Sequence, residues 1–180
     1  MRACIALILI VVLSACTPNP LAAGPTETPT PDLSYTNCGW QWAYERRDDI
    51  TARWQDELDK LGLPIINDGT FARAFGENCL GPNGEIIRFA TMEIDFTVAL
   101  NVLDFDDLNE RAKLVEPIIR LVIDSFPPSS LSAPNKGLVE FHFISSMQDG
   151  WARIRIDAAE RVFAEGKTGI DFYNEVMSQP

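Results

Sequence analysis

The side chains of this 180-residue chain that could do acid–base chemistry lie on a predicted β-hairpin near its C-terminus. A two-residue turn at Asp149-Gly150 joins the last two predicted strands. Counting back from that turn places His142, the one histidine of the chain, opposite Asp157. A carboxylate held beside an imidazole is a common arrangement for general acid–base catalysis. The predicted pairing therefore makes His142 and Asp157 a candidate for such chemistry.

Glu140 is the other acid partner available to this histidine. It lies on the same face of the hairpin as His142, because side chains two residues apart point to the same side of a strand. Further charged residues on the hairpin and on the long strand before it extend this surface. The full candidate binding face consists of Glu93, Asp95, Glu140, His142, Arg153, Arg155 and Asp157.

The residue types on this face leave three interpretations open. It is a surface that binds a partner or ligand, or it is the site of a hydrolase that uses His142 with Asp157 or Glu140. It is otherwise the solvated outer face of a half-buried sheet, with opposite charges set across the strands and no specific ligand. We assign no catalytic residue from the sequence.

Other arrangements do not meet the requirements of a site. Residues 104–110 are rich in acidic residues, but a twelve-residue calcium-binding loop that begins at Asp104 would lack the central glycine and would have Val115 in place of the final glutamate. Ser145 and Ser146 lie near His142 in the sequence, but no nucleophile motif surrounds them. One histidine and few cysteines do not make a zinc site. We therefore expect no metal and no cofactor.

The elements that position these residues follow from the spacing of apolar side chains. Helical spacing predicts a first helix over residues 39–61, with Trp40 and Trp54 on its buried face and Gly62 as its stop. Strict alternation predicts strands over residues 70–79 and 85–103.

A bulge is expected in the second of these strands, near Ala90, because the alternation changes parity there. A second helix is expected to begin at a capping Asp104 or Asp106, and Pro117 should kink or split it. The hairpin and two short helices follow, at residues 138–146, 151–157, 158–165 and 170–177.

This order of elements predicts an α+β fold. A helix followed by two strands occurs twice, and a helical segment ends the chain. The simplest packing is a two-layer sandwich, in which an antiparallel sheet of four to five strands carries the helices on one face.

The net charge excludes one class of partner. The chain carries 26 Asp and Glu residues against 15 Lys and Arg residues, a formal net charge of −11, and nearly all of it falls in residues 37–180. Nucleic-acid binding requires a basic surface, so we expect no nucleic-acid partner.

The first sixteen residues contain a processing signal. A basic residue, an apolar run of about ten residues and the sequence Leu13-Ser14-Ala15-Cys16 follow one another. The run is too short to span a bilayer, which takes roughly 20 residues. This segment resembles the bacterial lipoprotein signal peptide and its lipobox. The resemblance implies cleavage before Cys16 and attachment of acyl chains, palmitate among them, to that cysteine.

The lipoprotein resemblance also organises the remaining chain. Residues 1–15 are the expected signal peptide, and residues 16–36 are the expected anchor and stalk, rich in Pro and Thr, which cannot bury enough apolar surface to fold. Residues 37–180 form one expected globular domain. The protein is thus expected on the extracytoplasmic side of the cell membrane or the outer membrane.

Two cysteines remain after the signal peptide and the lipid site are set aside. Cys38 and Cys79 form an even pair in an oxidising compartment, so we predict a disulfide. In the chain-entropy model a loop of this size stabilises the fold by roughly 4 kcal/mol. Together these features favour a non-enzymatic lipoprotein that binds an envelope protein or a ligand, with an envelope hydrolase as the alternative.

Overall fold

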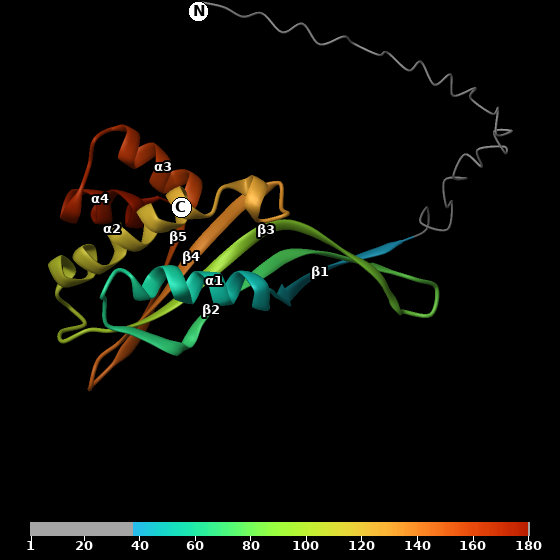
Figure 1. Cartoon of the computed structure of the whole chain (residues 1–180), viewed down its shortest axis with the longest axis horizontal. Helices are drawn as coiled ribbons and strands as arrows, with labels where there is room; N and C mark the ends of the chain where they lie inside the picture. The colour runs from blue at the N-terminus through green and yellow to red at the C-terminus, as the bar shows by residue number, and fades with distance from the viewer. Residues whose placement is uncertain (1–37, 180) are drawn as a thin grey trace, which may run out of the picture. The chain divides into compact units, whose positions relative to one another are not determined.

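Five strands and four α-helices give the chain an α+β fold (Figure 1). The structure is a computed structural model that describes residues 38–179, which lie within one compact unit, Thr36–Pro180. The expected signal peptide, the lipid site Cys16 and the stalk lie outside the described residues.

One strand and one helix come first, two strands and a helix follow, and two strands and two helices end the described chain. The strands are β1 (Gly39–Arg46), β2 (Ile65–Leu80), β3 (Ile86–Asn101), β4 (Asn135–Ile144) and β5 (Asp149–Arg155). The helices are α1 (Asp48–Asp59), α2 (Leu108–Ser125), α3 (Ile156–Ala164) and α4 (Gly169–Ser178), with a 3-10 turn, η2 (Pro128–Ser130), before β4.

The sheet is mixed, and the prediction of an antiparallel sheet was wrong. Its strands follow chain order, β1-β2-β3-β4-β5, and β3 runs parallel to β4 whereas the other neighbours are antiparallel. The segment between β3 and β4 contains all of α2. A connection of that length can return the chain to the starting end of β3, which parallel pairing requires.

The helix predicted over residues 39–61 was also wrong in its first half. Residues 39–46 form strand β1, and helix α1 begins only at Asp48. Trp40, Trp42 and Tyr44 alternate along β1, and the strand pairs with β2 over its whole length. Strand pairing overrode the helical spacing that Trp40 shares with the apolar residues of α1. The stop was predicted correctly, because Gly62 has a φ of +63° just after the helix.

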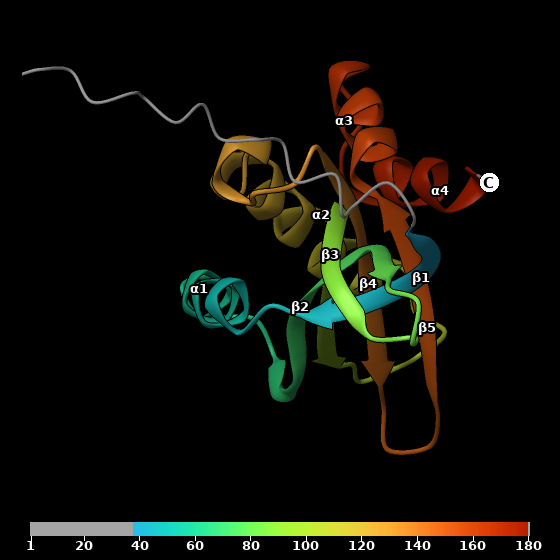
Figure 2. The same ribbon diagram turned by 90° about the vertical axis from the view of Figure 1, so that its right-hand side faces the viewer.

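The hydrophobic core lies between one face of the sheet and the helices. Phe96, Val98 and Leu100 of β3 and Phe141 of β4 are fully buried there. Helices α2, α3 and α4 contact one another, whereas α1 packs mainly on β2 (Figure 2). We call the sheet face that carries these apolar residues the core face and the opposite one the polar face.

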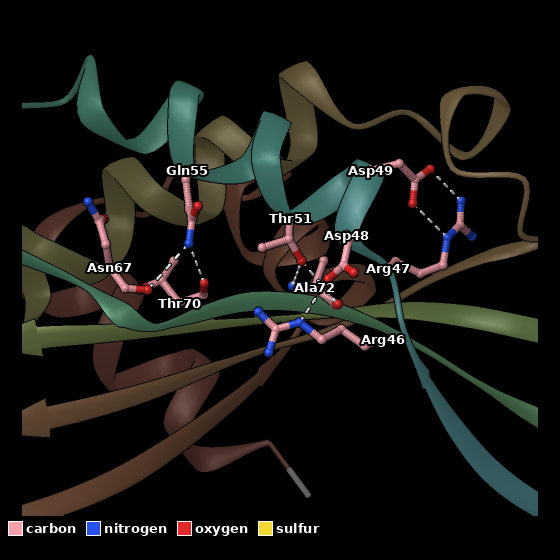
Figure 3. A network of polar contacts seen from close by, with 9 residues as sticks. All are labelled: Arg46, Arg47, Asp48, Asp49, Thr51, Gln55, Asn67, Thr70 and Ala72. Carbon is pink, nitrogen blue, oxygen red and sulfur yellow. Dashed lines mark hydrogen bonds and ion pairs between the residues drawn. The ribbon is translucent and has the colours of Figure 1, made fainter.

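Helix α1 takes the place of β1 along the first half of β2 (Figure 3). The Arg47 N–H donates to the Ala72 carbonyl oxygen at 3.0 Å, and the Ala72 N–H donates to Thr51 Oγ1 at 2.9 Å. Gln55 Nε2 donates to the carbonyl oxygens of Thr70 at 2.8 Å and Asn67 at 3.3 Å. Backbone groups at a strand edge need partners, and side chains of α1 supply them here.

Helix α2 differs from the prediction at its start and at Pro117. Asp107, rather than Asp104 or Asp106, is the N-cap, and its carboxylate accepts from the Asn109 and Glu110 N–H groups. The helix continues through Pro117, so the proline does not split it. The neighbouring turns of α2 supply buried residues to the core, and that packing outweighs the one backbone hydrogen bond that a proline removes.

The predicted disulfide is confirmed. Cys38 and Cys79 are bonded with their Cα atoms 5.0 Å apart, so the bridge holds the start of β1 against the end of β2. The expected bulge is also present, as a shift of register between β2 and β3 opposite Met92. Among the described residues no helix is long and apolar enough to cross a membrane.

The hydroxyl of Thr51 should contribute measurably more to the free energy of unfolding than the hydroxyl of Thr97 does. Thr51→Val leaves the buried Ala72 N–H without its acceptor and should lower the free energy of unfolding by about 1–3 kcal/mol. Thr97→Val is the matched control, because Thr97 Oγ1 is buried and has no hydrogen-bond partner within residues 38–179. That change should be neutral or stabilising. Urea unfolding of both variants gives the comparison, and equal losses would contradict this role for Thr51.

Candidate binding face

Six of the seven residues predicted for the binding face share the polar face of the sheet. Glu140 of β4 lies opposite Thr97 of β3 and Arg153 of β5, and Asp95 lies opposite Arg73 of β2. Because side chains alternate along a strand, Glu93, His142 and Arg155 point to this face as well. Asp157 lies beyond β5, in the first turn of α3.

A buried carboxylate links three strands at the centre of this face. Glu140 is only 4% exposed, and its two oxygens accept from Arg73 Nη2 at 2.9 Å and from Arg153 Nε at 2.7 Å. Arg73 Nε also lies 3.8 Å from Asp95 Oδ2. A buried charge is tolerated when it is paired and hydrogen-bonded, and these two guanidinium groups meet that condition.

Arg73 is a residue of this site that the sequence analysis missed. The available signal was its position between Ala72 and Ala74, two buried residues of β2. That alternation places Arg73 on the polar face. Its pairing with Glu140 depends on the order of three strands, which alternation alone does not give.

Asp95 is a carboxylate that the fold holds away from water. It is 2% exposed, and burial raises its pKa to about 6. The Leu138 N–H donates to its Oδ1 at 3.1 Å, and this bond together with the charge of Arg73 opposes the rise, whereas Glu93 and Glu140 add to it. The neighbouring Gly137 leaves the room for this carboxylate, since a Cβ there would lie 2.1 Å from Oδ1.

The predicted pairing of His142 with Asp157 was wrong. The turn between β4 and β5 is closed by a hydrogen bond from the Ser145 N–H to the Gln148 carbonyl oxygen, so Asp149 belongs to β5. This register places Trp151 opposite His142, and the two rings stack with centroids 4.1 Å apart. Nε2 of the histidine lies 2.8 Å from Asp149 Oδ2.

The serine next to this hairpin has a structural role. Ser145 Oγ donates to the Gln148 carbonyl oxygen at 2.8 Å and accepts from the backbone N–H of Met147 and of Gln148. Its hydroxyl is therefore occupied in closing the turn, and Glu140 is held by its two arginines. The pair of His142 and Asp149 lacks a nucleophile among the contacts that the described residues make.

Asp157 joins a shallow cavity beside the face. Its carboxylate accepts from Arg155 Nε at 3.1 Å and from Arg161 Nη1 at 3.3 Å. A cavity of about 350 Å³ brings together Glu93, Arg155 and Asp157 with Lys136. Charges of both signs line it, so it suits a small polar group more than an apolar one.

An aromatic stripe on β1 continues the polar face beyond the predicted residues. Trp42 stacks on Phe75 of β2 with centroids 5.2 Å apart, and Tyr44 packs on the same ring. The guanidinium of Arg73 lies 4.2 Å from the centre of the Tyr44 ring. The alternation of aromatic residues at positions 40, 42 and 44 was the signal for this stripe.

Comparison of the chain with models of known protein families, with curated proteins and with solved structures finds no match. Within residues 38–179 no group of three or more His, Cys, Asp or Glu side chains is placed to hold a metal ion.

Burial of Asp95 should make the free energy of unfolding depend on pH. Its folded pKa of about 6 exceeds the ordinary value of 3.8, so the folded state binds the proton more tightly. The stabilisation is complete below pH 4 and is lost as the pH rises through 6. Relative to Asp95→Asn, which cannot titrate, the wild-type protein should lose roughly 2 kcal/mol between pH 4 and pH 7.

Urea unfolding of both proteins at intervals from pH 4 to pH 7 measures this difference. Asp171→Asn, on helix α4, is a control that should keep the wild-type profile. A wild-type profile parallel to that of Asp95→Asn would show that Asp95 titrates normally.

Proposed function

We propose that this protein is a membrane-anchored, extracytoplasmic lipoprotein whose folded domain is a non-enzymatic binding module. In this proposal acyl chains on Cys16 hold the chain at the membrane and the helices form a single layer on the core face. The polar face of β3, β4 and β5 then remains available to an envelope protein or another extracytoplasmic ligand.

The observation that carries the proposal is the pair of exposed side chains on β5. Trp151 is 57% exposed and Arg153 70% exposed, yet each is held in place by a more buried neighbour. Trp151 stacks on His142, and Arg153 is bonded through Nε to the buried carboxylate of Glu140. A tryptophan and an arginine held in this way lose little conformational entropy on binding, and these residue types dominate binding energy at interfaces.

The chemistry of these two residues indicates the kind of group that would bind. Arg153 and the half-exposed Arg155 can donate to a carboxylate or a phosphate, and Trp151 offers a flat apolar surface. Each of these arginines already pairs with a carboxylate of its own chain, Arg153 with Glu140 and Arg155 with Asp157, so the remaining N–H groups are the ones open to a partner. The proposed partner surface is therefore anionic with an adjacent apolar or aromatic group.

The anchor rests on the sequence. The basic start, the short apolar run and Leu13-Ser14-Ala15-Cys16 are the features of a lipoprotein signal. Attachment of two or more acyl chains makes membrane binding stable, which a single chain does not achieve.

The lipid anchor has a direct test. Cells that produce the full chain are labelled with radioactive palmitate, and Cys16→Ser is compared with the wild-type protein. We expect Cys16→Ser to lose the label and to leave the membrane fraction. Cys38→Ser is the control, since its thiol belongs to the predicted domain and its loss should leave labelling unchanged. Equal labelling of Cys16→Ser would contradict the anchor.

Binding through β5 is tested by cross-linking in native membranes, followed by co-purification and mass spectrometry. Trp151→Ala should lower recovery of the bound partner about tenfold or more, as expected of a central interface residue. Arg153→Ala should do the same, and its free energy of unfolding is measured alongside, because this change also removes one of the two partners of the buried Glu140. Arg161→Ala is the matched control, because the Arg161 side chain is 63% exposed on α3 and, within residues 38–179, its guanidinium pairs only with the exposed Asp157. Recovery of the wild-type protein alone, or equal recovery with all three variants, would contradict this binding surface.

A further inference from the structure

Strand β1 is an edge strand that is exposed on both faces. It is the strand at one end of the sheet, and seven of its eight residues are exposed. Trp42 is 59% exposed, Tyr44 58% and Trp40 48%. In Figure 1 the strand runs beside the part of the β2–β3 hairpin that extends away from the helices. Long exposed edges with apolar side chains are sites of pairing with another strand.

The backbone groups that β1 offers at its free edge can be identified. Arg47, directly after the strand, donates its N–H to Ala72 of β2. Because N–H and C=O groups alternate in direction along a strand, the odd-numbered residues of β1 point these groups toward β2. The even-numbered residues Trp40, Trp42 and Tyr44 therefore point theirs to the outer edge. Their side chains lie on the polar face, so backbone donors and aromatic rings are offered together.

The strand is self-complementary about Ala43. Two antiparallel copies of β1 with a two-fold axis at this residue place each Trp42 opposite Tyr44 of the other copy. Each Trp40 then lies opposite Arg46, an arrangement that suits a cation–π contact. On the other side of the strand each Gln41 lies opposite Glu45. No two like charges meet, although the chain has a net charge of −11.

We propose that β1 pairs with β1 of a second copy of this chain, which joins two five-stranded sheets into one across a two-fold axis at Ala43. Isologous two-fold contacts are the commonest way in which identical chains associate. The pairing covers three half-exposed aromatic side chains in each copy and gives hydrogen-bond partners to the free edge. It does not depend on the binding surface of β5, which lies at the opposite edge of the sheet.

The size of the contact indicates a weak pair in dilute solution. Aromatic side chains bury about 150–250 Å² each, so six that are already half covered contribute well under the roughly 1,200 Å² of a stable interface. Confinement to one membrane raises the effective concentration of the copies and favours such a contact. The experiment is therefore done on the full chain in its native membranes.

Disulfide trapping tests the pair and its register together. Across the axis the Cα atoms at position 43 would lie about 4.5 Å apart, as in a pair without hydrogen bonds, and this is within bridging distance. Mild oxidation of Ala43→Cys should give a linked dimer on a non-reducing gel. Gln41→Cys and Glu45→Cys should each give about tenfold less when present alone, because neither position faces itself.

Co-expression of Gln41→Cys and Glu45→Cys supplies a second test at exposed positions that should not disturb folding. These positions face each other, so the mixture should link although neither variant does so alone. The wild-type protein, in which Cys38 and Cys79 are bonded to each other, shows the linkage that arises without a cysteine on β1. Absence of linkage both for Ala43→Cys and for the mixture would overturn the proposal. Linkage of Gln41→Cys alone at an equal level, or linkage of Ala43→Cys to a different protein, would overturn it as well.

Discussion

The carboxylate of Glu140 is the interaction on which the arrangement of the sheet depends. It lies on β4, is buried, and is neutralised by Arg73 from β2 and Arg153 from β5. Loss of either partner would leave one oxygen of a buried carboxylate without its charged hydrogen-bond donor, which is costly in a folded protein. A slip of one residue between β4 and β5 would turn Arg153 to the core face and have the same effect. The ion pairs thus select one register for strands that hydrophobic contacts alone would hold less specifically.

A second constraint acts at the edge of the sheet. Strand β2 is longer than its partner β1, so part of its edge would be left with unpaired backbone groups. Helix α1 covers that part with Thr51 and Gln55, and Trp54 Nε1 donates to the Thr97 carbonyl oxygen of β3 at 3.1 Å. The helix is therefore fixed by polar contacts of Thr51 and Gln55 and by the buried ring of Trp54. Beyond the reach of the helix, β1 provides the pairing and the disulfide holds it there.

How much of this could be predicted from the sequence depended on whether the signal was local. The alternation along β3, the glycine stop after α1 and the disulfide were predictable, because each needs only neighbouring residues or a count of cysteines. The polar face was also assigned to the right side of β4 and β5, although the turn was placed three residues too late. The face assigned to each side chain was still correct, because the true and predicted registers differ by an even number of residues. The predicted partner of His142 was wrong for the same reason, because His142 contacts Asp149 and Trp151 and not Asp157.

The remaining errors concern contacts between distant parts of the chain. Trp40 shares the helical spacing of the apolar residues of α1, and this spacing led to the prediction of a helix. Pairing with β2 is what places Trp40, Trp42 and Tyr44 in a strand. The parallel pairing of β3 with β4 likewise depends on where α2 packs. Arg73 reaches Glu140 across the intervening strand β3, and no sequence pattern within β2 predicts this contact.

The exposed aromatic residues divide into two groups that the core does not explain. Trp151 lies on β5 at one edge of the sheet, and Trp40, Trp42 and Tyr44 lie on β1 at the other. Trp151 stacks on His142, Trp42 and Tyr44 pack on Phe75, and Trp40 lies against the guanidinium of Arg88. Rings that are exposed and yet fixed contribute less to stability than buried rings of the same size. Their fixed orientation instead reduces the entropy lost when another surface covers them. Two such groups at opposite edges allow one edge to hold a second copy while the other remains free for a different partner.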